Sequence, residues 1–106
     1  MKLLAVVTTV ANRDQAQALA RALVDERLAA CVQISAIESV YRWEGAVQQD
    51  PEYRVLAKTV ASRWPAIEAA IRDRHPYALP QIVAFALDPV HPAYADWVAT
   101  ECGPPR

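Results

Sequence analysis

The stretch Cys31–Val60, CVQISAIESVYRWEGAVQQDPEYRVLAKTV, decides the fold because it has the composition of two long β-strands joined by a tight turn. Val, Ile, Tyr and Trp recur in both halves, and these residues favour strands. Gly45 lies in the middle of the stretch and tolerates the positive φ angle that a tight reversal requires. The sequence therefore predicts a two-stranded hairpin that reverses within Trp43–Ala46.

The length of this hairpin predicts a projecting tip. The segment Val32–Trp43 would extend about 40 Å as an uninterrupted strand, whereas a domain of this size has a radius of gyration of about 13 Å. The apolar alternation changes phase between Ile34 and Ile37, which predicts a bulge or a bend near Ser35–Ala36. Both faces of the tip carry large side chains. The tip is therefore either a twisted hairpin end with amphipathic aromatics or a contact with another subunit.

The segments that flank the hairpin have the periodicity of helices and buried strands. Leu3–Thr9 is apolar nearly throughout, which is typical of a central strand. The other expected elements are a helix over Arg13–Arg27 capped by Asn12, a helix that is capped by Ser62 and ends before His75–Pro76, a strand over Ile82–Leu87, and a last helix from Pro92. This order predicts an α+β, ferredoxin-like βαββαβ fold with a long central hairpin and a C-terminal helix.

Composition narrows the class of protein. With 106 residues we expect one domain, 1–106, and the apolar share of 54% argues against disorder. A net charge of −1 predicts no nucleic-acid partner and no membrane partner, and no apolar run approaches the length of a membrane span. Met1–Val7 superficially resembles a secretory signal but is short and lacks a cleavage site. Two cysteines without CxxC spacing favour a reducing, cytoplasmic location.

Motifs that would indicate a particular chemistry are few. The sequence contains no phosphate-binding glycine loop and no nucleophile elbow, and its two His and two Cys lack zinc-ligand spacing. His75 could be a ligand or a general base, or could simply end its helix. Cys31 reads as a small buried hydrophobe, Lys58 as either an anion contact or a solvated edge lysine, and Trp43 and Trp97 as packing residues.

Several strings nevertheless carry a family resemblance: ERLAACV at 26–32, VYRWEG at 40–45, Lys58–Thr59, His75–Tyr77 with Pro80, and Pro92–Tyr94 with Trp97. In this order and spacing they resemble the CutA family of divalent-cation tolerance proteins over nearly the whole chain. The resemblance implies a homotrimer in which hairpins pair across subunits, as in the PII signalling proteins. It also implies a role in the response to metal ions, without enzymatic activity.

The same resemblance implies the site residues. The metal ligands would be His75 and Cys31, and an intersubunit cleft would gather Tyr41, Trp43, Lys58, Tyr77 and Trp97. No cofactor is required, although Cu(II) or another divalent cation could bind. The chain has Thr8 and Arg74 where copper-binding members carry a Cys and a second His, so we expect weak copper binding. Ala78 likewise stands where a polar residue commonly follows His-Pro-Tyr.

Two alternatives to this reading differ in class. The first is a PII-like sensor that binds a small molecule or an anion in the intersubunit cleft, with Lys58, His75 and the aromatic residues lining it. The second is an enzyme with His75 as general base, which we disfavour because neither a nucleophile nor an oxyanion-stabilising element accompanies it.

Overall fold

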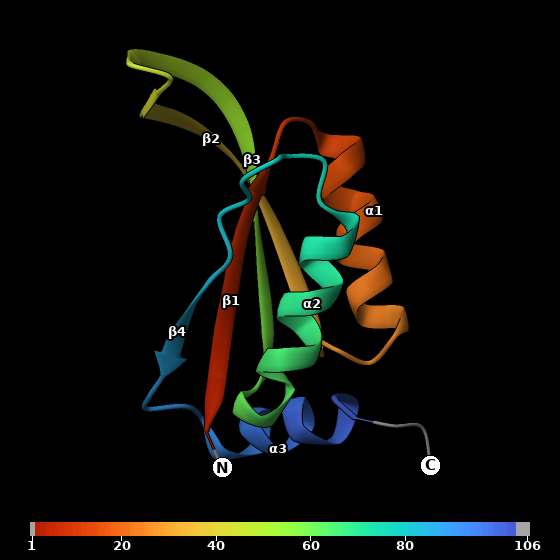
Figure 1. Ribbon diagram of the computed structural model, residues 1–106. Helices are drawn as coiled ribbons and strands as arrows, with labels where there is room; N and C mark the ends of the chain where they lie inside the picture. The colour runs from red at the N-terminus through yellow and green to blue at the C-terminus, as the bar shows by residue number, and fades with distance from the viewer. Residues whose placement is uncertain (1, 104–106) are drawn as a thin grey trace.

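The structure, a computed structural model, describes residues 2–103, and its elements follow the predicted order (Figure 1). They are β1 (Leu3–Val10), α1 (Arg13–Asp25), β2 (Cys31–Trp43), β3 (Ala46–Val60), α2 (Trp64–Arg74), β4 (Val83–Leu87) and α3 (Pro92–Glu101), with a short 3-10 turn over Ala61–Arg63. The strands form one antiparallel sheet in the order β2-β3-β1-β4. None of the helices within residues 2–103 is both long and apolar enough to cross a membrane.

The hairpin of β2 and β3 is continuous. Every residue of β2 has one partner in β3, from Cys31 opposite Lys58 to Trp43 opposite Ala46, so the predicted bulge near Ser35–Ala36 is wrong. The alternative, a bend, is visible in Figure 1, where the hairpin curves to one side beyond the end of β1. The apolar phase changes because Ile34 packs into the core beside α1, whereas this packing ends where the hairpin projects past the sheet.

The turn of the hairpin confirms the predicted reversal. Glu44 and Gly45 have φ angles of 50° and 80°, which is the pattern of a two-residue type I′ turn. Such a turn twists in the same sense as the strands it joins, so a long hairpin can continue to the tip without splaying. Val40 and Val47 near the tip are 67% and 64% exposed, so the tip carries apolar surface that this chain does not cover.

The helices α1 and α2 cover one face of the sheet. Val6 and Ala57 on the strands pack there against Leu23, Ile67 and Ile71 of the two helices, and all five side chains are buried. β1 lies between β3 and β4 with nearly every residue buried, as its apolar sequence predicts. This face is the main core, and it fixes the position of the strand ends where the candidate site lies.

The helix ends are set partly by the predicted residues. Asn12 caps α1 through a hydrogen bond of 2.8 Å from the Gln15 amide to its side chain. α1 ends at Asp25, two residues before the predicted end, and Arg27 has a φ angle of 59° that no helix continues through. Ser62 does not cap α2, because it lies inside the preceding 3-10 turn. α2 ends just before His75–Pro76, as predicted.

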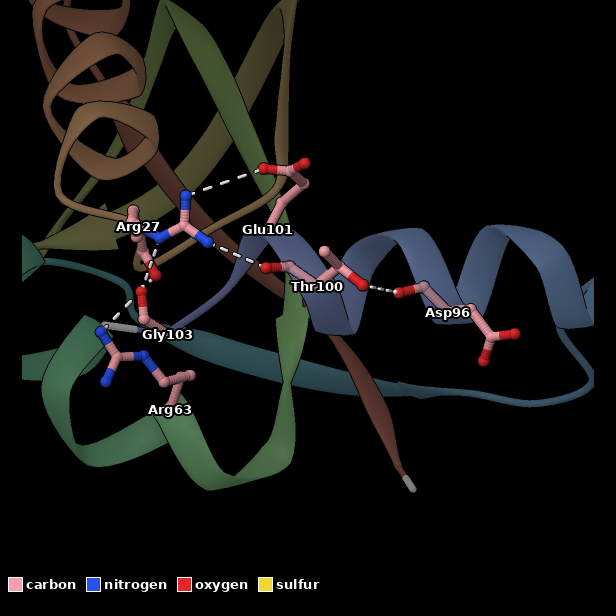
Figure 2. A network of polar contacts seen from close by, with 6 residues as sticks. All are labelled: Arg27, Arg63, Asp96, Thr100, Glu101 and Gly103. Carbon is pink, nitrogen blue, oxygen red and sulfur yellow. Dashed lines mark hydrogen bonds and ion pairs between the residues drawn. The ribbon is translucent and has the colours of Figure 1, made fainter. Parts of the chain in front are cut away.

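The other face of the sheet is only partly covered. α3 packs across one end of it, where Leu3, Val60, Val98 and Cys102 form a second cluster of buried residues. Figure 2 shows how Arg27 fastens the end of this helix: its guanidinium donates hydrogen bonds to the carbonyl oxygens of Gly103 at 2.7 Å and Thr100 at 2.8 Å. Away from α3 the face is open, and Phe85 of β4 is 55% exposed.

Candidate functional site

A hollow of about 980 Å³ lies between the hairpin, the end of β1 and the connection from α2 to β4. Figure 1 shows this connection passing across the sheet below the bend of the hairpin. Tyr41 and Trp43 line the hollow from β2, Asp50 and Glu52 from β3, and Tyr77 from the crossing connection. The hairpin bend and the end of β1 make this concavity, so it depends on the projection that the sequence predicts. It is large enough for a small organic molecule.

Two pairs of a tyrosine and a carboxylate organise the hollow. The Tyr41 hydroxyl donates to Oδ2 of Asp50 at 2.7 Å, and the Tyr77 hydroxyl donates to Oε2 of Glu52 at 2.8 Å. Asp50 and Glu52 are two residues apart on β3, so their side chains leave the same face of the strand. The pair between Tyr77 and Glu52 joins the crossing connection to the hairpin and so holds two walls of the hollow together.

Burial and the neighbouring carboxylates raise the pKa of both phenols. The hydrogen bond to Asp50 is the main cause of a raised pKa of Tyr41, because it stabilises the neutral phenol beside a negative charge. The pKa of Tyr77 is also raised, first by burial and then by its hydrogen bond to Glu52. Both tyrosines are therefore hydrogen-bond donors over the whole physiological pH range, and the carboxylates are their acceptors.

His75 stands behind this wall and is fully engaged by the backbone. The Tyr77 amide donates to its Nδ1 at 3.1 Å, and its Nε2 lies 2.9 Å from the carbonyl oxygen of Thr9. A carbonyl can only accept and an amide can only donate, so the imidazole is neutral with its proton on Nε2. Burial lowers the pKa of His75, and the Thr9 carbonyl and the charge of Glu52 oppose that effect. A metal ion could bind this ring only if one of the two hydrogen bonds broke.

A second cluster lies at the other end of the open face. Lys58 is the cross-strand partner of Cys31, and its Nζ lies 5.3 Å from the ring centroid of Tyr94 on α3. The Tyr94 ring in turn lies 5.6 Å from that of Trp97, which is 43% exposed. This cluster therefore offers one ammonium group, which a cation–π contact holds over Tyr94, and an accessible indole beside that ring.

The structure divides the predicted site residues between these two places. Tyr41, Trp43 and Tyr77 line the hollow, whereas Cys31, Lys58 and Trp97 lie near α3. Lys58 and Glu52 are six residues apart on β3, which corresponds to about 20 Å.

The two predicted metal ligands, His75 and Cys31, are likewise apart within one chain. His75 contacts Thr9 at one end of β1, while Cys31 pairs with Lys58 opposite Ala5. Within residues 2–103, no three His, Cys, Asp or Glu side chains converge as a metal site would require. Thr8, which stands at the expected cysteine position, is buried in the core and not in the hollow.

Sequence reasoning missed the two carboxylates. Asp50 and Glu52 flank Pro51 in the second strand of the hairpin, and neither was among the site residues predicted from the sequence. The signal that could have found them is their spacing, because two acids at alternate positions of a strand lie on one face. Ala78, which stands where a polar residue commonly follows His-Pro-Tyr, also lines the hollow but carries no charge. The negative charge of the hollow comes from Asp50 and Glu52 instead.

Comparison with known proteins identifies relatives over nearly the whole chain. The family described as CutA1 divalent ion tolerance protein matches residues 4–101 of this chain. The divalent-cation tolerance protein CutA of Thermus thermophilus is 39% identical over 99 residues, which cover 92% of this chain and 96% of that protein. Protein CutA of Mus musculus is 38% identical over 95 residues, covering 89% of this chain but 54% of the mouse protein.

A solved structure extends the likeness from sequence to fold. CutA1 from Oryza sativa superimposes with a TM-score of 0.94 at 34% identity, and the match covers 97% of this chain and 95% of that one. An agreement of this kind includes the antiparallel four-stranded sheet and its helices. The likeness therefore reaches every element that borders the hollow.

Proposed function

This chain belongs to the CutA1 divalent ion tolerance family, and on that premise we propose that it acts as a non-enzymatic homotrimer in the response to metal ions, binding Cu(II) weakly. The observation that carries the family role is the match over residues 4–101 together with the shared fold. The βαββαβ element order and the strand order β2-β3-β1-β4 support describing the fold as ferredoxin-like, as in PII-type trimers.

Surface that one chain leaves open supports the proposed trimer. The hairpin projects beyond the sheet and exposes Val40, Val47 and Trp43 to solvent, and β2 is an edge strand with unpaired backbone groups. In a trimer, the hairpin of one subunit would cover the open face of the next. Such packing would place the hollow beside a neighbouring subunit and so form the predicted intersubunit cleft.

The state of His75 supports weak copper binding. Its two ring nitrogens already have backbone partners, so Cu(II) must displace the Tyr77 amide or the Thr9 carbonyl to bind the imidazole. Losing such a hydrogen bond costs about 0.5–1.5 kcal/mol, which weakens a site that has one histidine per subunit. The engagement of both nitrogens also supports a non-enzymatic role, because a general base needs a free lone pair.

Native mass spectrometry of the metal-free protein, before and after substoichiometric Cu(II), tests assembly and metal together. We expect a trimer that takes up copper in the wild type and less copper in His75→Ala. His91→Ala is the matched control because it removes the other histidine of the chain. A monomer at micromolar concentration contradicts the trimer, and equal copper uptake by wild type and His75→Ala contradicts the proposed ligand.

The hollow favours a second candidate function, a PII-like sensor that binds a small molecule where subunits meet. Its volume of about 980 Å³ and its aromatic walls are the specific observation that supports this function. Thermal shifts in the presence of small organic ligands, but not of metal ions, would favour the sensor over the metal-binding role. We place the protein in the cytoplasm in either case, because Cys31 and Cys102 are both free thiols.

A further inference from the structure

The charged side chains that line the hollow all have the same sign. Asp50 and Glu52 contribute carboxylates, and the described residues of the lining include neither Lys nor Arg. Glu38 also borders the hollow, but it lies on the opposite face of the hairpin. Each tyrosine hydroxyl engages one oxygen of its carboxylate, which leaves Oδ1 of Asp50 and Oε1 of Glu52 without a donor among residues 2–103. The hollow therefore presents oriented acceptors and negative charge to whatever enters it.

The same hollow has accessible aromatic surface. Tyr41 is 42% exposed and Trp43 is 44% exposed, and both line the cavity on the same face of the hairpin as Asp50 and Glu52. The face of an aromatic ring attracts a cation, and Trp is the strongest of the side chains in this respect. Aromatic walls and carboxylates are independent features, and both select for positive charge carried by a partly apolar molecule.

From this arrangement we propose that the hollow binds a small organic ammonium ion, with its charge at Asp50 and Glu52 and its apolar part against Tyr41 and Trp43. The inference rests on the second candidate function, the small-molecule sensor, and it names the charge of the ligand. The sequence allowed either a small molecule or an anion in the intersubunit cleft, whereas the carboxylates of the hollow favour a cation. Lys58, which the family resemblance placed in the cleft, lies about 20 Å from Glu52 within the chain.

Three probes of similar shape separate charge from apolar contact: benzylammonium, benzyl alcohol and benzoate. Binding is measured on the intact assembled protein at low salt, by isothermal titration and by the NMR signals of the tryptophan indoles. We expect benzylammonium to bind about tenfold more tightly than benzyl alcohol, and benzoate to bind most weakly. Added NaCl should weaken only benzylammonium, since salt screens the charge but not the apolar contact.

Two substitutions assign the preference to the hollow. Glu52→Gln keeps the shape and an acceptor for Tyr77, and we expect it to reduce the preference for benzylammonium over benzyl alcohol at least about threefold. Trp43→Leu removes one aromatic face and should also reduce that preference. Glu68→Gln is the matched control, because Glu68 is a carboxylate on α2 that pairs with Arg72 outside the hollow. Circular dichroism confirms that each variant is folded.

The outcomes separate this inference from the proposed trimer and copper binding. Equal affinity for the three probes, or a preference that survives Glu52→Gln, overturns it even in a trimer that binds copper. Displacement of benzylammonium by MgCl₂ beyond that by NaCl of equal ionic strength, with no effect of Trp43→Leu, also overturns it, because the hollow would then be a simple acidic cation site. A charge preference in a protein that neither trimerises nor binds copper upholds it and contradicts only those proposals.

Discussion

Two buried threonines, Thr8 and Thr59, differ in their hydrogen bonding. The same substitution, Thr→Val, should therefore change stability differently at the two positions. Thr8 and Thr59 are 1% and 0% exposed, and both lie on the helix-covered face of the sheet. The Thr59 hydroxyl donates to the carbonyl oxygen of Leu28 at 2.7 Å, whereas Oγ1 of Thr8 has no hydrogen-bond partner within residues 2–103. Thr→Val is close to isosteric, so the two substitutions differ mainly in that Thr59→Val removes a hydrogen bond and Thr8→Val removes none.

The expected effects have opposite signs. Thr59→Val leaves the Leu28 carbonyl buried and unpaired, which should lower the free energy of unfolding by about 2 kcal/mol per chain. Thr8→Val removes a hydroxyl whose desolvation is not repaid, and should raise the free energy of unfolding by about 1 kcal/mol per chain. The two variants should therefore differ by about 3 kcal/mol, which is well above the error of a denaturation curve.

Urea denaturation followed by tryptophan fluorescence measures this difference at one fixed protein concentration, since the stability of an oligomer would depend on concentration. The slopes with denaturant should agree, so that the shift in midpoint reports stability alone. A Thr8→Val variant as destabilised as Thr59→Val would refute the reasoning, because it would show that the Thr8 hydroxyl has a buried partner.

Three further predictions concern the elements that support the site. Arg27→Met should lower the free energy of unfolding by about 1–3 kcal/mol, because it removes two hydrogen-bond donors from the end of α3. Arg21→Met is the control at an exposed arginine and should change the free energy of unfolding by less than about 1 kcal/mol. Equal urea midpoints for the two variants would contradict this prediction. Folding lowers the pKa of His75, so just below pH 6.5 the unfolded chain binds more protons than the folded chain. The free energy of unfolding should therefore decrease as the pH drops from 6.5 through the pKa of the folded state. Melting curves of wild type and His75→Gln at pH 7.5 and about 5.5 check this, and an equal pH dependence in both would count against it. Gly45→Ala should cost about 1 kcal/mol because Gly45 has a φ angle of 80°, and an unchanged melting temperature would show that the turn relaxes.

The architecture of the sheet was predictable from local patterns. The β-branched and aromatic residues of Cys31–Val60 and the single glycine at the reversal predict the hairpin, and the apolar run in β1 predicts a central strand. These features depend on residues close in the sequence. The bend was predicted only as one of two alternatives, because a change of apolar phase also arises when a strand leaves the helices that cover it.

The candidate site was predictable in part. The aromatic residues at the hairpin tip and Tyr77 were identified through the family resemblance, and the structure places them around one hollow. The pairing of Tyr41 with Asp50 and of Tyr77 with Glu52 was not predicted, because the second pair joins segments 25 residues apart. The tautomer of His75 also depends on a distant group, the carbonyl oxygen of Thr9 on β1.

The sequence by itself therefore determined the order of helices and strands, the position of the reversal and the family to which the chain belongs, since all three depend on local patterns of residue type. Only the tertiary structure decided the sign of the charge in the hollow, the engagement of both nitrogens of His75 and the separation of Lys58 from the tip aromatics. The physical reason is that hydrogen bonds and charge act through space, and the bend of the hairpin and the crossing of the α2–β4 connection determine which groups meet.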